Sequence, residues 1–108
     1  MSLLYLILFL QLGGINYNVN SIEPPVELKS ILSDDYSQVF VSLKTPTDKE
    51  VGFELYNSDN RIVHLWHNQN LQSGDHFLKL ELPELTSGKF ILKILVAQDE
   101  YKHLIWIP

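Results

Sequence analysis

Apolar and polar residues alternate in several short runs between Val51 and Val96, and turn-forming residues separate these runs. In the first run, residues 51–56, one face is uniformly apolar because it carries Val51, Phe53 and Leu55. Alternation with a period of two predicts a half-buried antiparallel strand whose apolar face turns toward the core. We therefore expect this stretch to form the centre of an all-β domain.

A hairpin follows directly in the sequence. The four residues Asn57–Asn60 have short side chains that bond to the local backbone, and Asn and Asp tolerate a positive φ angle. The chain then returns through Arg61–Trp66, where large apolar side chains stand on both faces. This pattern predicts either a β-bulge or burial on both sides of the returning strand.

The same pattern predicts strands before and after the hairpin. We expect them over Val26–Leu32, Val39–Lys44, Phe77–Leu82, Phe90–Val96 and Tyr101–Ile107. The segment His67–Gly74 is polar apart from Leu71 and indicates a connection between sheets, and Gln98–Glu100 indicates a second hairpin turn. With turns about every ten residues and no helical period after the leader, the chain predicts a seven-stranded antiparallel immunoglobulin-like β-sandwich.

Side-chain alternation also predicts which residues share the core. One apolar face from each central strand should contribute, so we expect a single cluster that contains Phe53, Leu55, Leu80, Phe90, Leu92 and Ile94. Leu85 should hold the turn before the Phe90 strand against this cluster. Gly88 should then let the chain change direction.

The N-terminus carries the apolar run Leu3–Leu10. A membrane-spanning helix needs about 20 such residues, so this run is too short to span a bilayer and resembles the central region of a signal peptide. We predict that residues 1–21 are a signal peptide, cleaved after Ser21 or, alternatively, near Gly14, and that residues 22–108 form one domain. The predicted location is secreted, periplasmic or cell-surface.

An alternative for the leader follows from its first residues. Met1 and Ser2 carry no positive charge, whereas a signal peptide usually begins with a basic region. The run could instead be a retained hydrophobic strand or an anchor. In that case the leader would be the part of the chain that contacts a membrane.

Composition narrows the function. The chain has 108 residues and a net charge of −5 without a run of basic residues, which disfavours nucleic-acid binding. It has no cysteine, which excludes disulfides, thiolate catalysis and cysteine-bound zinc.

The residues that could carry catalysis form no recognisable set. His64 and His67 should point to opposite faces of their strand, and nothing in the sequence places His76 or His103 beside them. The acidic pairs Asp34–Asp35 and Asp99–Glu100 lie in turn contexts, and the serines lack a nucleophile motif. We therefore predict no catalytic residue, no cofactor, no metal site and no enzymatic activity.

The order of the motifs resembles the C-terminal sorting domains of the type IX secretion system and the immunoglobulin-like domain of flagellar hook-capping proteins. The resemblance rests on Gly52–Tyr56, the turn before Arg61–Val63, the loop that ends at Gly74, and Leu85–Ile94. It implies a sandwich that acts by protein–protein interaction, with a partner in the envelope or the secretion machinery.

Three positions depart from the family pattern. Asn60 stands where the family usually has glycine, Phe90 stands where tyrosine is usual, and Leu104–Pro108 lacks the basic terminus of sorting domains. The substitutions are compatible with the fold, because Asn accepts a positive φ angle and Phe is buried as readily as Tyr. The terminus indicates a free-standing relative of those domains.

The aromatic residues suggest where a partner binds. Trp66, Trp106 and Tyr56 would form an exposed patch if they lay opposite the core, or they could cap the ends of the sandwich. The candidate partner-binding residues are Trp66, His67, Tyr101, Ile105 and Trp106. The alternative function is a carbohydrate or small-ligand module that uses Trp66, His67 and the loop Asn68–Gly74.

Overall fold

The computed structural model describes residues 25–108, so the predicted signal peptide, residues 1–21, lies outside the described part. This part contains strands and no helix. The strands are β1 (Glu27–Leu32), β2 (Gln38–Thr45), β3 (Lys49–Asn57), β4 (Ile62–Leu65), β5 (Gln69–Leu71), β6 (Gly74–Glu81), β7 (Gly88–Val96) and β8 (Asp99–Ile107). The predicted all-β class is confirmed.

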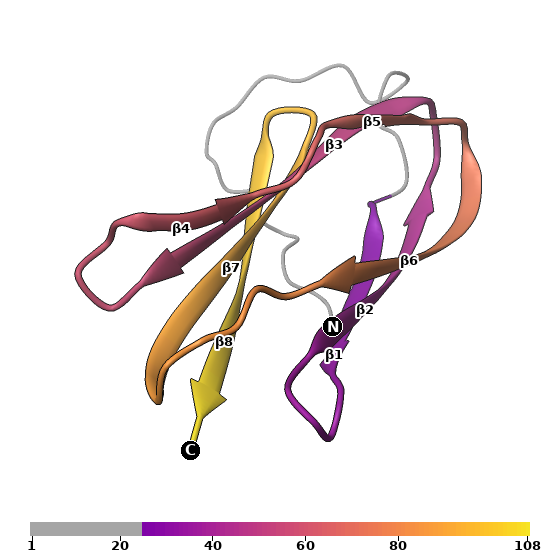
Figure 1. Ribbon diagram of the computed structural model, residues 1–108. Coiled ribbons are helices and arrows are strands. Elements are labelled where there is room, and N and C mark those ends of the chain that lie inside the picture. Colours follow the sequence, from indigo (N-terminus) through magenta and orange to yellow (C-terminus); the bar gives the residue numbers. More distant parts are fainter. Residues whose placement is uncertain (1–24) are drawn as a thin grey trace.

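The strands form two antiparallel sheets that pack face to face (Figure 1). The smaller sheet has the order β1-β2-β6, and the larger has the order β4-β3-β7-β8 with β5 also paired to β3. The chain therefore crosses between the sheets after β2, when it enters β3, and again between β5 and β6 and between β6 and β7. Because these crossings interleave the two sheets, residues far apart in the sequence share one core.

That core matches the predicted alternation. Phe53, Leu55, Leu80, Phe90, Leu92 and Ile94 all belong to one buried cluster, as expected from their strand faces. Val39, Val41 and Leu43 enter it from β2, which also turns Thr45 inward. The Thr45 hydroxyl is satisfied because it donates to the carbonyl of Gln72 at 3.2 Å. Leu85 packs against the cluster, which confirms its predicted role.

The hairpin between β3 and β4 is formed by local hydrogen bonds. The Asn57 side-chain oxygen accepts from the backbone N–H groups of Asp59 at 2.9 Å and Arg61 at 3.0 Å. Asn60 has a φ of 64°, the left-handed conformation that its side chain tolerates. The predicted turn is confirmed, including the position at which a glycine would have been the usual choice.

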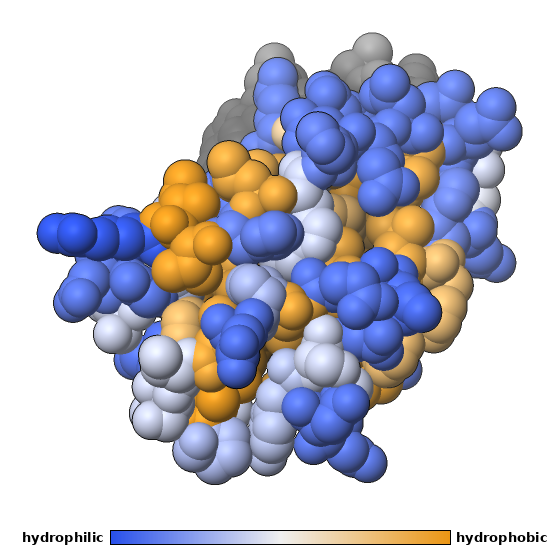
Figure 2. Space-filling view, in the orientation of Figure 1, coloured by the Kyte–Doolittle hydropathy of each residue, from blue (hydrophilic) through white to orange (hydrophobic). Residues whose placement is uncertain are grey.

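The returning strand β4 contains the predicted bulge. It is not buried on both sides, which was the alternative prediction. The pairing of β3 with β4 shifts between Leu55 and Tyr56, so one extra residue of β4 is accommodated there. Ile62, Val63 and Leu65 remain exposed. In Figure 2, hydrophobic surface lies over β4, beside the hydrophilic tip of the β3–β4 hairpin.

Two connections differ from the prediction. The segment expected as a loop between sheets contains β5, since residues 69–71 pair with residues 49–51 of β3 and Leu71 is buried. Eight strands are therefore present in residues 25–108, where seven were expected. The last hairpin turn consists of Ala97 and Gln98 alone, so Asp99 and Glu100 belong to β8. These two acidic residues do not form the turn in which they were placed.

Candidate interaction surface

An apolar row crosses the outer face of the larger sheet. The strand registers align Ile62 with Tyr56, Tyr56 with Ile91, and Ile91 with Leu104, so one side chain from each of β4, β3, β7 and β8 lies in the row. The two ends are open to solvent, with Ile62 50% and Leu104 51% exposed. Neighbouring strands lie about 4.8 Å apart, so these four side chains form a continuous strip.

Trp106 extends this apolar row along β8. It lies two residues beyond Leu104 on the same face, and 62% of its surface is exposed. An exposed tryptophan beside an apolar row is a common feature of protein interfaces, where aromatic residues are enriched. We call Ile62, Tyr56, Ile91, Leu104 and Trp106 together the outer strip.

A charged row runs beside the outer strip. Glu54, Lys93 and Lys102 lie opposite one another on β3, β7 and β8. Lys93 and Lys102 approach Glu100 at 4.0 and 3.9 Å. These ion pairs are partly solvated, so they contribute little to stability.

Tyr56 connects the charged row to the outer strip. Its hydroxyl donates to Glu54 at 2.7 Å, and this hydrogen bond raises the pKa of Tyr56 above its usual value of 10.0. The Lys93 ammonium lies 4.3 Å from the centre of the Tyr56 ring, within the range of a cation–π contact. The outer face therefore carries the outer strip, with the charged row on one side of it and Lys89 opposite Trp106 on the other.

The outer strip ends at an edge strand. β8 is the last strand of the larger sheet, and no strand among residues 25–108 pairs with its second edge. It is paired with β7 over its whole length without an irregularity. An edge of this kind can accept a strand from another chain.

Backbone geometry determines which groups lie on that edge. The Ala97 N–H donates to Glu50 on β3 at 2.9 Å, so the odd-numbered residues of β7 face β3 and the even-numbered ones face β8. The even-numbered residues of β7 pair with odd-numbered residues of β8, whose backbone groups therefore point to β7. The N–H and C=O groups of the even-numbered residues Lys102, Leu104 and Trp106 consequently point to the open edge.

The five residues predicted to bind a partner do not form one surface. Ile105 lies in the core, 1% exposed, and Tyr101 packs partly against it. Trp66 also packs against the core, with its ring 4.5 Å from that of His64, and His67 is exposed in the loop that follows. Trp106 alone of the two tryptophans faces outward, so they do not make the shared patch that the sequence allowed.

Tyr56 was named in the possible aromatic patch, but the row that it forms with Ile62, Ile91 and Leu104 was missed for a specific reason. Tyr56, Ile91 and Leu104 all stand out of phase with the core residues of their strands, which is a visible signal in the sequence. Alternation does not reveal the register between strands, however, and without it the three residues could not be aligned into one row.

A serine and a histidine meet between the two sheets. Ser30 on β1 and His103 on β8 are 73 residues apart in the sequence, and the Ser30 hydroxyl lies 2.6 Å from Nδ1 of His103. Both side chains are half-buried, and burial lowers the pKa of His103 below its usual 6.5. The pair joins one edge strand of each sheet by a polar contact in an otherwise apolar interface.

The burial of His103 predicts a pH dependence of stability. Because burial disfavours the charged imidazole, the unfolded chain binds a proton on His103 at a higher pH than the folded chain does. The free energy of unfolding should be largest above the unfolded pKa, about 6.5, and should fall as the pH drops through the lowered pKa of the folded state. We expect urea unfolding to show this loss in the native chain and a smaller loss in His103→Gln.

The loss of stability that Asp35, in the turn before β2, causes in acid can be separated from the loss caused by His103. Hydrogen bonds from Ser37 and Ser33 lower the pKa of Asp35 below 3.8. The stability that the Asp35 carboxylate contributes is therefore lost at a lower pH than the one at which the protonation of His103 begins to destabilise the fold. If His103→Gln lost as much stability as the native chain between about pH 6.5 and the usual carboxylate range near about pH 4, another group would be responsible.

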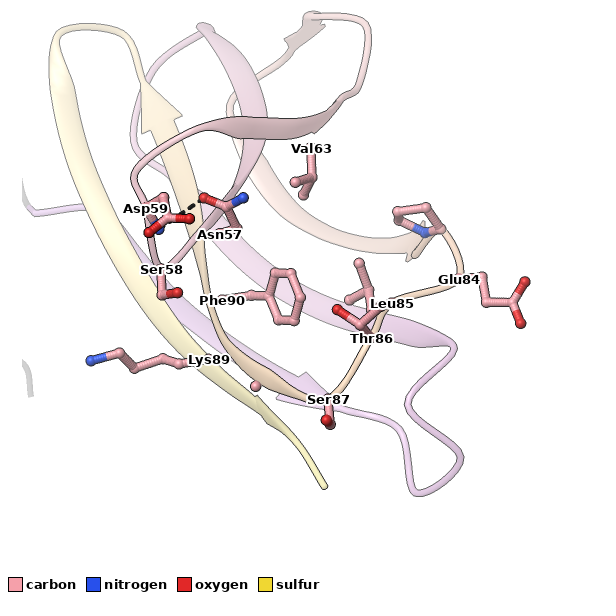
Figure 3. A pocket seen from close by; sticks show the side chains of 12 residues that line it. Asn57, Ser58, Asp59, Val63, Glu84, Leu85, Thr86, Ser87, Lys89 and Phe90 are labelled. Atoms are coloured by element: carbon pink, nitrogen blue, oxygen red, sulfur yellow. Dashed lines mark hydrogen bonds between the residues drawn. The ribbon is translucent and has the colours of Figure 1, made fainter.

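A hollow of about 380 Å³ lies at one end of the two sheets. Figure 3 shows Val63, Leu85 and Phe90 directed into it, between the β3–β4 turn and the connection from β6 to β7, whereas Lys89 and Glu84 point away. Its floor is apolar and its rim consists of loop residues.

The smaller sheet has an apolar group of its own. Phe40 and Phe77 stack on its outer face with their ring centres 6.3 Å apart, and Phe77 is 74% exposed. Ile31 of β1, 58% exposed, lies opposite Phe40 on one side, and Lys79 of β6 lies opposite it on the other. Phe77 is therefore an exposed aromatic residue on the face opposite the outer strip, which makes it a useful control position.

Other kinds of site find no support in residues 25–108. This range contains no group of three or more His, Asp or Glu side chains arranged to hold a metal ion. It also contains no helix that is long and apolar enough to cross a membrane.

Comparison with known proteins gave no relative. No protein-family model matches the chain, and no curated protein matches it.

Proposed function

We propose that this protein is a small secreted or envelope-associated module that acts by protein–protein interaction and not by catalysis. The observation that carries the proposal is the open edge of β8 together with the exposed Leu104 and Trp106. Backbone groups at an edge provide affinity, and side chains on alternate positions provide selectivity. The charged row beside the outer strip would fix the orientation of the partner.

We also propose that the fold is an immunoglobulin-like sandwich of the sorting-domain type. The strand order is consistent with this proposal, because three strands, β1-β2-β6, face a sheet ordered β4-β3-β7-β8. The leader supports placement outside the cytoplasm, since an apolar run of this length fits a signal peptide. The resemblance to sorting domains implies a partner in the envelope or the secretion machinery.

The alternative, a carbohydrate or small-ligand module, has less support. A module of this kind would need Trp66, His67 and the loop Asn68–Gly74 to form one accessible surface. Trp66 packs against the core and part of the loop is paired to β3 as β5, so these residues do not offer a stacking platform.

The proposal predicts that Trp106 is essential for partner capture. With the full chain as bait in extracts of the source cells, Trp106→Ser should weaken capture of specific partners at least about tenfold, the effect of losing an interface hot spot. Phe77→Ser is the matched control, because it removes another largely exposed aromatic residue, from the smaller sheet.

Capture should be quantified by titrating the bait and comparing partner bands between variants. Equal loss in both variants, or retention in Trp106→Ser at the native level, would show that the outer strip is not the binding surface. Both substitutions concern exposed side chains, so neither should change the melting temperature by more than a few degrees.

A further inference from the structure

We infer that one partner of β8 is a second copy of the same chain, with the two β8 strands paired antiparallel about Leu104. This inference rests on the proposed function, because it specifies the partner of the same edge. Such a pairing has two-fold symmetry, so each residue of β8 contacts the same set of residues in the other copy.

β8 is the edge strand best suited to pairing. On the opposite side of the larger sheet, β4 has four residues and a bulge and β5 has three. In the smaller sheet, β1 has six residues, and the outer face of β6 carries three charged residues. Short, bulged and charged edges resist pairing with other chains. β8 has nine residues in regular pairing and two exposed apolar side chains.

The sequence of β8 is self-complementary about Leu104. In this register, Leu104 faces Leu104 of the second copy, and Lys102 faces Trp106 of that copy. The first pair is apolar and the second places an ammonium beside an aromatic ring, and both are favourable cross-strand pairs. The facing residues are even-numbered, so their backbone groups are those directed to the open edge.

Neighbouring registers are less favourable. Pairing about Lys102 places two ammonium groups opposite each other, which is destabilising. Pairing about His103 places Glu100 against Trp106 and the two half-buried His103 rings against each other. Pairing about Ile105 shortens the overlap, because within β8 only the residues from His103 to Ile107 then lie opposite one another.

The register about Leu104 also joins the two outer strips. Leu104 is the terminal residue of the aligned row that begins at Ile62. When Leu104 meets Leu104, the row continues without a break across β8, β7, β3 and β4 of the second copy. The side chains of Leu104 and Trp106, which are exposed in the single chain, are then covered in both copies.

The dimer should be weak. Strand pairing plus these few side chains covers less than the roughly 1,200–2,000 Å² of a stable interface, so a dissociation constant of about micromolar order is expected. Association should therefore depend on concentration between about 1 and 100 µM in light scattering after gel filtration. The full chain is to be used for this measurement.

The absence of cysteine from the chain allows a direct test of the register. Leu104→Cys places two thiols on facing residues, whose Cα atoms should lie about 5.5 Å apart, within the range of a disulfide. Lys102→Cys is the matched control, since its two thiols would lie four residues apart along the pair, about 14 Å, beyond the roughly 7 Å limit. Phe77→Cys controls for random collision on the other face.

We expect oxidised glutathione to convert Leu104→Cys to a covalent dimer several times faster than either control. Equal rates in all three variants, or a chain that remains monomeric throughout the concentration range, would overturn the inference. A dimer without faster cross-linking through Leu104→Cys would also overturn it, because the contact would then lie elsewhere. In each of these cases, loss of captured partners in Trp106→Ser would still support the proposed function, so the two can fail separately.

Discussion

Phe53→Ala should destabilise the domain by about 3–5 kcal/mol, the range for removing a buried aromatic side chain from a core. Phe53 is 1% exposed and lies at the centre of β3, between β4 and β7 in the larger sheet and facing the smaller sheet. Its removal leaves a cavity in contact with both sheets. For a domain of this size the loss is a large share of the total stability, so partial unfolding at 37 °C is expected.

The measurement is the midpoint of urea unfolding for the native chain and for two variants. Phe77→Ala is the control, because it makes the same chemical change at a side chain that is 74% exposed. Its cost should stay within about 0.5 kcal/mol. A loss below about 1 kcal/mol for Phe53→Ala would mean that Phe53 does not fill the centre of the core.

The inward faces were predictable because alternation is a local property. In β2, β3 and β7 the apolar residues that alternate along the middle of each strand are all buried, so reading the sequence with a period of two was sufficient there. The hairpin at Asn57–Asn60 was predictable for a similar reason, since its conformation is determined by side chains within the turn.

The short strand β5 could not be predicted in this way. Three residues do not establish a period, and Gln69 and Asn70 have no strong preference for strands. Their conformation is imposed by pairing with β3, which lies almost twenty residues earlier in the sequence. Tertiary pairing here overrides local propensity.

The candidate surface was predictable only in part. Trp106 was identified from its position in an apolar strand, but Ile105 was grouped with it although the two residues point to opposite sides. Alternation separates the two faces of β8 without saying which one is inside. The Ser30–His103 contact was likewise inaccessible, because it depends on how the two sheets face each other.

A pair of proline substitutions should separate the two edges of β8. Ile105 directs its N–H to β7, so Ile105→Pro removes a bond of the ladder, adds strain in the core and should cost about 3 kcal/mol or more. Leu104 directs its N–H to the open edge, where proline is tolerated. Leu104→Pro should therefore fold, with a melting temperature close to that of Leu104→Ala.

The central claim, that the open edge of β8 binds the partner, is tested most directly by partner capture with folded Leu104→Pro and with Leu104→Ala. The two variants lack the same side chain, but only Leu104→Ala retains the edge N–H. We predict that Leu104→Ala captures partners weakly and that Leu104→Pro captures none, because proline blocks strand pairing at the centre of the edge. Capture by Leu104→Pro equal to that by Leu104→Ala, with both variants folded, would contradict docking through this edge.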